Sequence, residues 1–318
     1  MTKTIKIGTR GSALALVQAE MVCAGFREHH PDVSCEIVEI RTSGDWKPEH
    51  GETRLSEADG GKGLFAKEIE AALIRGDIDC AVHSMKDMPA GLPDGLILDC
   101  VLPRADVRDA VILNGRWRGR VDSLDALPKD TVVATSSTRR AAFVLNKRPD
   151  LSVTPIRGNV PTRIDKVRGQ DMADATILAY AGLERLRLQD DVDFILDPQT
   201  DMIPAACQGA VCIEVREEDR ALRDLLKPLN CPESDICAMA ERAALQILDG
   251  SCKTPIGAYA MLDGQTLDLV VAVLSLDGTE IYKEQITASV TGRADAIAAG
   301  AACGRKLKQV VPDHCLTC

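Results

Sequence analysis

At the N-terminal end of the chain, apolar positions change repeatedly from the period of a strand to that of a helix. A short apolar run predicts a strand at residues 5–9, and Ser12 is suited to cap a helix in which apolar residues recur at helical spacing. Further strands are predicted at 35–40 and 78–82, with a second helix between them. The order of these elements indicates a βαβ series.

The same alternation starts again after Pro103. Strands are predicted at 132–135, 153–157 and 176–179, and the first of them leads into a helix. Two consecutive α/β units predict two doubly wound domains. Because such folds bind ligands beyond the carboxyl ends of their strands, the cleft between the two domains is the expected site.

The C-terminal part of the chain has a different pattern. Its predicted elements are a helix, three β runs and a last helix, at residues 238–248, 256–262, 267–276, 281–287 and 293–307. Asp-Gly pairs at 263–264 and 277–278 separate the β runs, and Asp-Gly between strands is a strong hairpin signal. We therefore expect a small α+β domain with a three-stranded antiparallel sheet.

Other segments bear on where the protein is expected to act. Residues 1–8 lack the apolar core of a signal peptide, and no apolar run approaches the roughly 18 residues of a membrane helix. These observations predict a cytoplasmic protein without a membrane partner.

The polar segment 45–63 has no hydrophobic period and is expected to be a loop or a lid.

The chain contains 12 cysteines. They are scattered over a long chain without an export signal, so we expect thiols rather than disulfides. Cys315 and Cys318 follow His314 and could form half of a metal site, but a frayed C-terminal tail is the favoured interpretation. We assign no metal from the sequence.

The net charge of −10 argues against nucleic-acid binding, which needs a basic face. Several arginines nevertheless fall near predicted strand ends or strand-to-helix junctions. They are Arg10, Arg139, Arg140, Arg157, Arg163 and Arg185. Arginine binds carboxylates bidentately and stays charged, so the set predicts a ligand with many carboxylates. The competing interpretation is a series of independent surface ion pairs.

The segment 135–140 illustrates both interpretations. Serines at the opening turn of a helix lie beside two arginines, so that unpaired backbone N–H groups and guanidiniums would hold a carboxylate or a phosphate. A capped helix with two solvated arginines explains the same residues about as well. The segment alone leaves the choice open.

Two further residues are candidates for chemistry. Asp87 follows Lys86 after a predicted buried strand. It is either half of a surface pair in a turn or a cleft carboxylate that stabilises a cationic intermediate and takes part in proton transfer. Cys252 lies in a predicted loop, where a cysteine is usually inert, although Lys253 beside it would favour the thiolate.

Seven segments, taken in their order, resemble those of the porphobilinogen deaminase (hydroxymethylbilane synthase) family. They are residues 9–19, 60–65, 83–89, 135–140, 157–163, 208–210 and 250–257. The resemblance implies two domains similar to periplasmic binding proteins and a third that bears a cofactor cysteine. It places domain 1 at 1–102, completed by 203–228 when the chain returns, domain 2 at 103–202 and the C-terminal domain at 229–318.

The family carries a dipyrromethane cofactor in thioether linkage to the cysteine that Cys252 matches. The resemblance implies that four porphobilinogen molecules are added to this primer, each losing ammonia to give an azafulvene, and that hydrolysis releases hydroxymethylbilane. It also implies a monomer whose ligands are porphobilinogen and the growing polypyrrole chain.

By the same resemblance, Asp87 is the catalytic carboxylate and lies near the pyrrole nitrogens. The residues matched to cofactor binding are Cys252, Lys86, Ser137, Arg139, Arg140 and Asp87, and those matched to substrate binding are Arg10, Ser12, Arg157, Arg163 and Arg185. The sequence departs from common family residues at Thr138, Lys253 and Thr254. These departures leave the local fit around the cofactor open.

Two other functions explain part of the pattern. A solute-binding or effector-sensing module would also have two α/β lobes around an anion cleft, but it gives no role to a third domain with a reactive cysteine. A different deaminating or carbon–carbon-bond-forming transferase of carboxylated substrates would keep the enzyme class. The segment around Cys252 argues against it.

Overall fold

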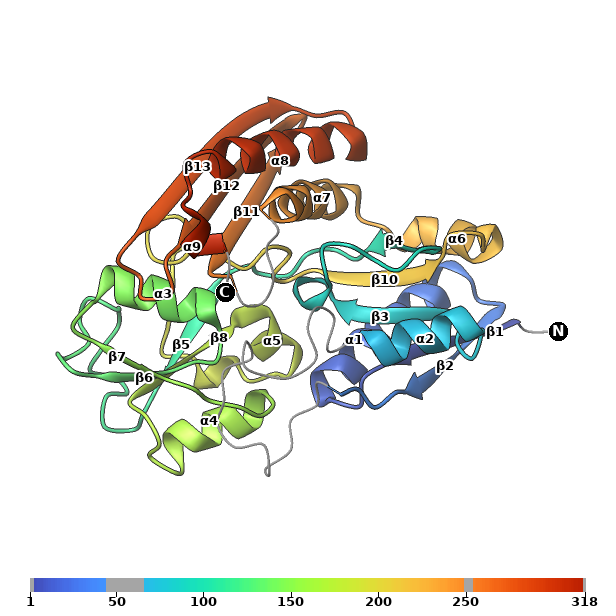
Figure 1. The fold of residues 1–318 in the computed structure, drawn as a ribbon. Coiled ribbons are helices and arrows are strands. Elements are labelled where there is room, and N and C mark those ends of the chain that lie inside the picture. The colour runs from blue at the N-terminus through green and yellow to red at the C-terminus, as the bar shows by residue number, and fades with distance from the viewer. Residues whose placement is uncertain (1–2, 44–65, 249–253, 317–318) are drawn as a thin grey trace.

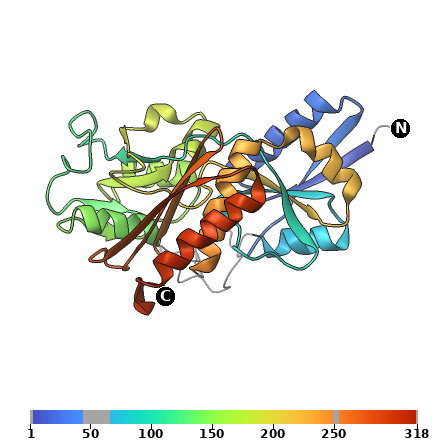
Figure 2. The same ribbon diagram turned by 90° about the horizontal axis from the view of Figure 1, so that it is seen from above.

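The computed structural model describes residues 3–43, 66–248 and 254–316. Two α/β lobes lie side by side, and a smaller third domain packs against both of them (Figure 1). The view from above shows the helices of the third domain crossing over the junction of the lobes (Figure 2). Among the residues described, no helix is both long and apolar enough to cross a membrane.

The first lobe is built on a five-stranded sheet of order β2-β1-β3-β10-β4. Its strands are β1 (Lys3–Thr9), β2 (Val33–Glu39), β3 (Cys80–Ser84), β4 (Leu96–Val101) and β10 (Val211–Arg216), and its helices are α1 (Ala13–His29), α2 (Lys67–Arg75), α6 (Arg220–Leu226) and the short 3-10 helices η3 (Met85–Asp87) and η5 (Lys227–Leu229). Strand β1 is parallel to β2 and β3, whereas β10 is antiparallel to β3 and β4. A strand from late in the chain therefore lies inside the first sheet.

The second lobe repeats this arrangement with the order β7-β6-β8-β5-β9. Its strands are β5 (Asp109–Leu113), β6 (Val132–Ala134), β7 (Ser152–Thr154), β8 (Ala175–Ala179) and β9 (Phe194–Ile195), and its helices are α3 (Thr138–Lys147), α4 (Val160–Arg168), α5 (Tyr180–Arg185) and η4 (Gln189–Asp191). Strand β6 is parallel to β7 and β8, and β5 is antiparallel to β8. Both lobes thus direct the carboxyl ends of three parallel strands towards loops and helix starts.

Two linkers join the lobes, residues 102–108 on the way out and 196–210 on the way back. They lie against each other, because the backbone N–H of Ala105 donates to the carbonyl of Gly209 at 3.2 Å. Gly209 has a φ of +87°, and a Cβ there would come within 2.5 Å of the Ala105 carbonyl oxygen. Only glycine fits this crossing of the two linkers.

The third domain has a three-stranded antiparallel sheet of order β11-β12-β13. Its elements are α7 (Pro232–Ile247), β11 (Ile256–Asp263), β12 (Thr266–Leu274), β13 (Ile281–Ser289), α8 (Arg293–Lys308) and α9 (Asp313–Leu316). Both predicted Asp-Gly turns are confirmed, with positive φ at Gly264 (57°) and Gly278 (73°).

The two faces of β12 explain how this domain is attached. Leu269, Val271 and Val273 pack against the helices of the third domain. The alternate residues Val270 and Ala272 pack against apolar side chains of the second lobe. Because side chains alternate across a strand, one strand serves two cores, which accounts for the nearly unbroken apolar run seen in the sequence.

Helix α7 connects the third domain to both linkers through one buried carboxylate. Glu241 accepts hydrogen bonds from Arg104 of the first linker (Nη1, 2.7 Å) and from the backbone N–H of Ala260 on β11 (2.8 Å). It also accepts from the backbone N–H of Cys207 in the second linker. The side chain of Glu241 is fully buried, and Arg104 is its paired charge. Glu241 therefore contributes to all three attachments.

The fold predicted from the sequence is confirmed in its class, with two doubly wound α/β lobes and a small α+β domain. The sequence did not predict the antiparallel strands β4, β5 and β10. Strands β5 and β10 are almost wholly buried, and short buried runs carry no alternation that would mark them as strands. Strand β4 alternates in burial over its first four residues, but three of these residues in a row are apolar, which hides the alternation in the sequence. The whole of the predicted loop or lid at 45–63 lies outside the described residues. The domain boundaries stay a prediction.

Candidate active site

A cavity of about 1500 Å³ lies between the two lobes and reaches the third domain. Its walls include the segments that follow the carboxyl ends of β1, β3, β6 and β7. Gln208 and Gly209 of the second linker, together with Thr254 and Ile256 of the third domain, complete it. The volume exceeds the roughly 300–1,000 Å³ of pockets for drug-sized ligands, so the cavity suits a larger ligand.

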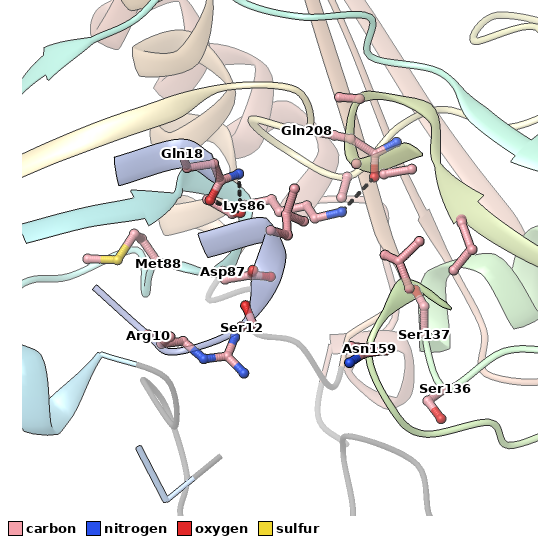
Figure 3. Close-up of a pocket in the computed structure, with 18 of the residues that line it drawn as sticks. Arg10, Ser12, Gln18, Lys86, Asp87, Met88, Ser136, Ser137, Asn159 and Gln208 are labelled. Atoms are coloured by element: carbon pink, nitrogen blue, oxygen red, sulfur yellow. Dashed lines mark hydrogen bonds between the residues drawn. The ribbon is translucent and has the colours of Figure 1, made fainter. Parts of the chain in front are cut away.

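The first lobe contributes residues from two turns. Ser12 accepts a hydrogen bond from the backbone N–H of Ala15 at 3.3 Å and so caps α1, which fixes the turn that carries Arg10. Lys86 and Asp87 belong to η3, directly after β3. Figure 3 shows Arg10, Ser12 and Asp87 together on one side of the cavity, with the amine of Lys86 pointing across it.

A smaller hollow of about 70 Å³ adjoins this side and shares Arg10, Ser12 and Asp87 with the main cavity. Gln18 and Ser84 line it as well, and the Gln18 amide nitrogen donates to the Ser84 hydroxyl at 2.8 Å. The hollow is large enough for a water molecule or another molecule of that size. Asp87 therefore borders both spaces.

The second lobe contributes the start of α3. Ser137 caps this helix by accepting from the backbone N–H of Arg140 at 3.4 Å. Arg139 and Arg140 stand in the first turn, where positive charge opposes the helix dipole. Both side chains are buried, with 5% and 7% of their surface exposed. An isolated pair of buried cations would be very unfavourable, so a nearby anion is required.

Asp109, at the start of β5, is that anion. It accepts from Nη2 of Arg139 (2.7 Å) and from Nε (3.0 Å) and Nη2 (2.8 Å) of Arg140. Burial alone would raise the pKa of the Asp109 carboxyl, but the charges of the two arginines outweigh it and hold the pKa well below its ordinary value. At Arg139, burial and the positive charge of Arg140 lower the pKa of the guanidinium. Together they outweigh the negative charge of Asp109, which raises it.

Gln208 connects this cluster to the first lobe. Its amide nitrogen donates to Asp109 at 3.0 Å, and its amide oxygen accepts from Nζ of Lys86 at 3.3 Å. Burial, followed by the charge of Arg140, lowers the pKa of Lys86 to about 8. The accessible part of the Lys86 side chain faces the cavity. The lysine is thus a cation that surrounding protein has largely desolvated.

The remaining predicted arginines lie on the second lobe. Arg157 is buried before α4, and Arg163 within α4 donates from Nε to the carbonyl of Gly158 at 2.8 Å. Arg185 donates from Nη2 to the carbonyl of Gly209 at 2.6 Å. The prediction that Arg185 lies at a strand-to-helix junction was wrong, because it ends α5. That helix has 6 residues and directly follows β8, so its last residue still reaches the cavity.

In this wall, Nε of Arg139 and Nε of Arg185 are buried without a hydrogen-bond partner among the described residues. A buried N–H group without an acceptor costs about 1–3 kcal/mol. Both side chains line the cavity. A ligand with several carboxylates would supply the missing acceptors, so this donor set fits a multiply anionic cofactor.

The structure brings together every predicted site residue that it describes. The cavity wall includes Arg10, Ser12, Lys86, Asp87, Ser137, Arg139, Arg140, Arg157, Arg163 and Arg185. Cys252, the predicted attachment point of the cofactor, lies outside the described residues. Thr254, two positions further along the chain, lines the cavity.

Sequence reasoning missed Asp109 as part of this site. Nothing in its local sequence distinguishes it from other aspartates, because its partners are about thirty positions away at Arg139 and Arg140. Gln208 stood inside one of the segments used for the family resemblance, yet no role was assigned to it. Its role depends on a contact between lobes that only the fold creates.

Comparison with known families gives two matches that together cover most of the chain. Residues 5–224 match the family model described as "Porphobilinogen deaminase, dipyromethane cofactor binding domain". Residues 236–309 match the one described as "Porphobilinogen deaminase, C-terminal domain". The two matches follow each other along the chain in the same order as the two lobes and the third domain.

Curated relatives give the same result. A porphobilinogen deaminase of Nitrobacter hamburgensis is 46% identical over 305 residues, which is 95% of this chain and 92% of the relative. One of Bacillus subtilis is 44% identical over 289 residues, covering 90% of this chain and 88% of the relative.

Among solved structures, the methionine-binding protein MetQ is similar to this chain over 71% of this chain and 88% of the MetQ chain, with 16% identity and a TM-score of 0.42.

Proposed function

The chain belongs to the porphobilinogen deaminase family, and we propose that it acts as a hydroxymethylbilane synthase, a transferase that joins four porphobilinogen molecules with loss of ammonia. It is an enzyme of tetrapyrrole synthesis and contains the family's dipyrromethane cofactor binding domain. Its ligands in this proposal are porphobilinogen and the growing chain, and it works as a monomer. Domain boundaries near residues 102, 202 and 228 complete the proposal.

The observation that carries the proposal is the convergence of cations on one large cavity. Lysine and arginine side chains from both lobes line it, although the chain as a whole has a net charge of −10. Each porphobilinogen unit brings two carboxylates, so a growing chain accumulates negative charge with every addition. A series of desolvated guanidiniums offsets that charge far better than water-exposed lysines would.

The cofactor would be held mainly by the second lobe. We assign its carboxylates to Lys86, Ser137, Arg139 and Arg140, and its covalent attachment to Cys252. Asp109 and the backbone carbonyls of Ile203 and Ile177 hold the two guanidiniums in the cavity wall, so that their charges are in place before a cofactor binds. When bound, the dipyrromethane supplies the terminal pyrrole carbon that is extended.

Asp87 is the proposed catalytic carboxylate. It borders both the main cavity and the hollow of about 70 Å³. A carboxylate in this position stabilises positive charge on the pyrrole of an arriving substrate and accepts or returns a proton as ammonia departs. The small hollow beside it has room for the departing ammonia or for the water of the final hydrolysis.

Incoming substrate would be bound by other residues of the cavity wall, from both lobes. We assign this role to Arg10, Ser12, Arg157, Arg163 and Arg185, all of which line the same cavity. Arg10 and Ser12 stand beside Asp87 in Figure 3. Carboxylates held there would place the reacting carbon close to the catalytic group, which lowers the entropic cost of the reaction.

Intact-mass measurement tests the proposal directly. The purified parent should carry a covalent adduct of two linked pyrroles, and Cys252→Ser should lack it. Cys231→Ser is the matched control, since Cys231 is a half-buried cysteine away from the cavity, and it should keep the adduct. A parent that stays unmodified after incubation with porphobilinogen would instead favour a solute-binding module.

A further inference from the structure

A second cluster of reactive side chains lies in the third domain. Glu280 precedes β13, while His314 and Cys315 belong to α9. A carboxylate oxygen, an imidazole nitrogen and the thiol sulfur of these residues all lie within 4.8 Å of one another. None of the three lines the large cavity. The cluster is therefore separate from the proposed active site.

The position of Glu280 is fixed by the turn between β12 and β13. Asp277 accepts from the hydroxyl of Ser275 (2.6 Å) and from the backbone N–H and hydroxyl of Thr279 (3.1 and 2.8 Å). The backbone N–H of Glu280 donates to the Ser275 hydroxyl at 3.0 Å. A turn with this many internal hydrogen bonds holds the Glu280 backbone in place before any ligand binds.

The carboxylate of Glu280 is also oriented. The hydroxyl of Tyr282 donates to Oε2 at 2.6 Å, while Oε1 lies 3.5 Å from Nε2 of His314. One oxygen is thus occupied by a hydrogen bond and the other faces the imidazole. Carboxylates that bind metals are commonly oriented in this way by a neighbouring donor.

The distance between Glu280 and His314 agrees with a zinc site. Two ligand atoms about 2.0–2.1 Å from a tetrahedral zinc ion lie about 3.4 Å apart, which is close to the 3.5 Å between Glu280 and His314. Cys315 is buried at the edge of the third domain's core, whereas the side chains of Glu280 and His314 are 41% and 61% exposed. Because the side chains of Glu280 and His314 are exposed, they can move closer to the Cys315 sulfur when an ion binds.

We propose that Glu280, His314 and Cys315 bind one zinc ion, with water as the fourth ligand. Imidazole, thiolate and carboxylate together are a usual donor set for zinc. The Cys315 thiol gives its proton to solvent when its sulfur binds the ion, so no oxidant or reductant is needed. One thiolate and one carboxylate neutralise the double positive charge of the ion, which suits a position at the edge of an apolar core.

The site would attach the C-terminal helix to the sheet. Helix α9 has only 4 residues, too few to be stable alone. The sequence favoured a frayed tail here, but residues 313–316 form this helix against the third domain. A metal bridge from α9 to the β12–β13 turn stabilises the folded form, because unfolding would separate the ligands.

Cobalt titration tests the proposal on the full chain after treatment with a chelator and a reductant. We expect one Co²⁺ per chain, with a thiolate-to-cobalt charge-transfer band and strong visible bands typical of four-coordinate cobalt, and displacement of Co²⁺ by Zn²⁺. Cys315→Ser should remove the charge-transfer band. His314→Ala and Glu280→Gln should each weaken binding at least tenfold, and Tyr282→Phe should weaken it about 10–100-fold.

Cys231→Ser is the matched control. Its thiol donates to the carboxylate of Glu233 at 3.3 Å, so it is also a cysteine beside an acidic group, and it should bind Co²⁺ as the parent does. Because Cys315 is buried and its variant could fold poorly, the exposed His314 gives an independent measurement. A parent that takes up no stoichiometric Co²⁺, or a His314→Ala variant that binds it as tightly as the parent, would overturn the proposal.

Discussion

The amide oxygen of Gln208 accepts a hydrogen bond from Nζ of Lys86 at 3.3 Å, while its amide nitrogen donates to Asp109 at 3.0 Å. Lys86 belongs to the first lobe and Asp109 to the second, so one fully buried linker side chain connects the polar groups of both. An amide is suited to this position because it satisfies a cation and an anion at once without adding charge.

Replacing this amide should therefore destabilise the protein. Gln208→Leu leaves Lys86 and Asp109 each without one buried partner, which should lower the unfolding free energy by about 1–3 kcal/mol. Denaturant titration would measure the loss. Gln170→Leu, which removes an exposed amide that contacts Asp165, should change stability by less than about 0.5 kcal/mol. Equal effects of the two substitutions would contradict the bridging role.

Asp87→Asn tests the proposed catalytic carboxylate. The substitution keeps the size of the side chain and leaves the cationic wall intact, so the cofactor should still be attached and the substrate still bound. Turnover should fall by about 10²–10³-fold, because the charge that stabilises the cationic pyrrole is lost. Steady-state kinetics combined with intact mass would separate these effects. A kcat within tenfold of the parent, with the adduct present, would refute the role.

Asp109→Asn should be strongly destabilising. It removes the charge that offsets Arg139 and Arg140, both of which are buried, and breaking such a buried pair typically costs about 3–5 kcal/mol. Asp77→Asn is the matched control, since Asp77 pairs with Arg75 on the surface, where both side chains are more than half exposed, and it should cost no more than about 1 kcal/mol. Urea denaturation of both variants would settle the comparison.

The pKa of Lys86 predicts a dependence of stability on pH. Burial and the charge of Arg140 lower it from 10.5 to about 8 in the folded protein. Between these values the unfolded chain binds more protons than the folded one, so the unfolding free energy should rise as the pH increases from about 8 towards 10.5. Below about pH 8 both states are protonated, and the contribution of Lys86 is constant.

A Cys252→Ser background is suited to this measurement, because carboxylates of an attached cofactor would raise the pKa of Lys86 again. Lys86→Met in that background has no proton to lose. The difference in unfolding free energy between the two proteins should therefore be constant below about pH 8 and should change above it in favour of the protein with Lys86. Parallel pH profiles would show that the pKa of Lys86 is not lowered.

The elements that the sequence predicted well are those with a clear period or turn signal. Helix α8 and the strands of the third domain were predicted to within a few residues, because Asp-Gly turns separate the strands. Strand β10 was missed as an element. It is almost wholly buried between β3 and β4, and neighbours so distant in sequence leave no local pattern.

The sequence predicted the cationic residues of the candidate site, but not the carboxylate that holds two of them in place. Arginine at a strand end is a recognisable signal, and the described arginines do line one cavity. The sequence treated Arg139 and Arg140 as open to a ligand, whereas both donate to Asp109. That contact depends on how β5 packs against α3, which periodicity and spacing do not specify.

Both linkers and the strand β11 are attached to Glu241, and the backbone N–H of Ala258 on β11 also donates to the carbonyl of Pro204 in the second linker at 2.9 Å. A rotation of one lobe against the other that moves the linkers would therefore act on β11. This strand begins at Ile256, four positions after Cys252 in the sequence. If a longer product widens the cleft, the movement is transmitted to the chain segment next to the proposed attachment point of the primer, and amide exchange in 196–210 and in β11 should change together as the product lengthens.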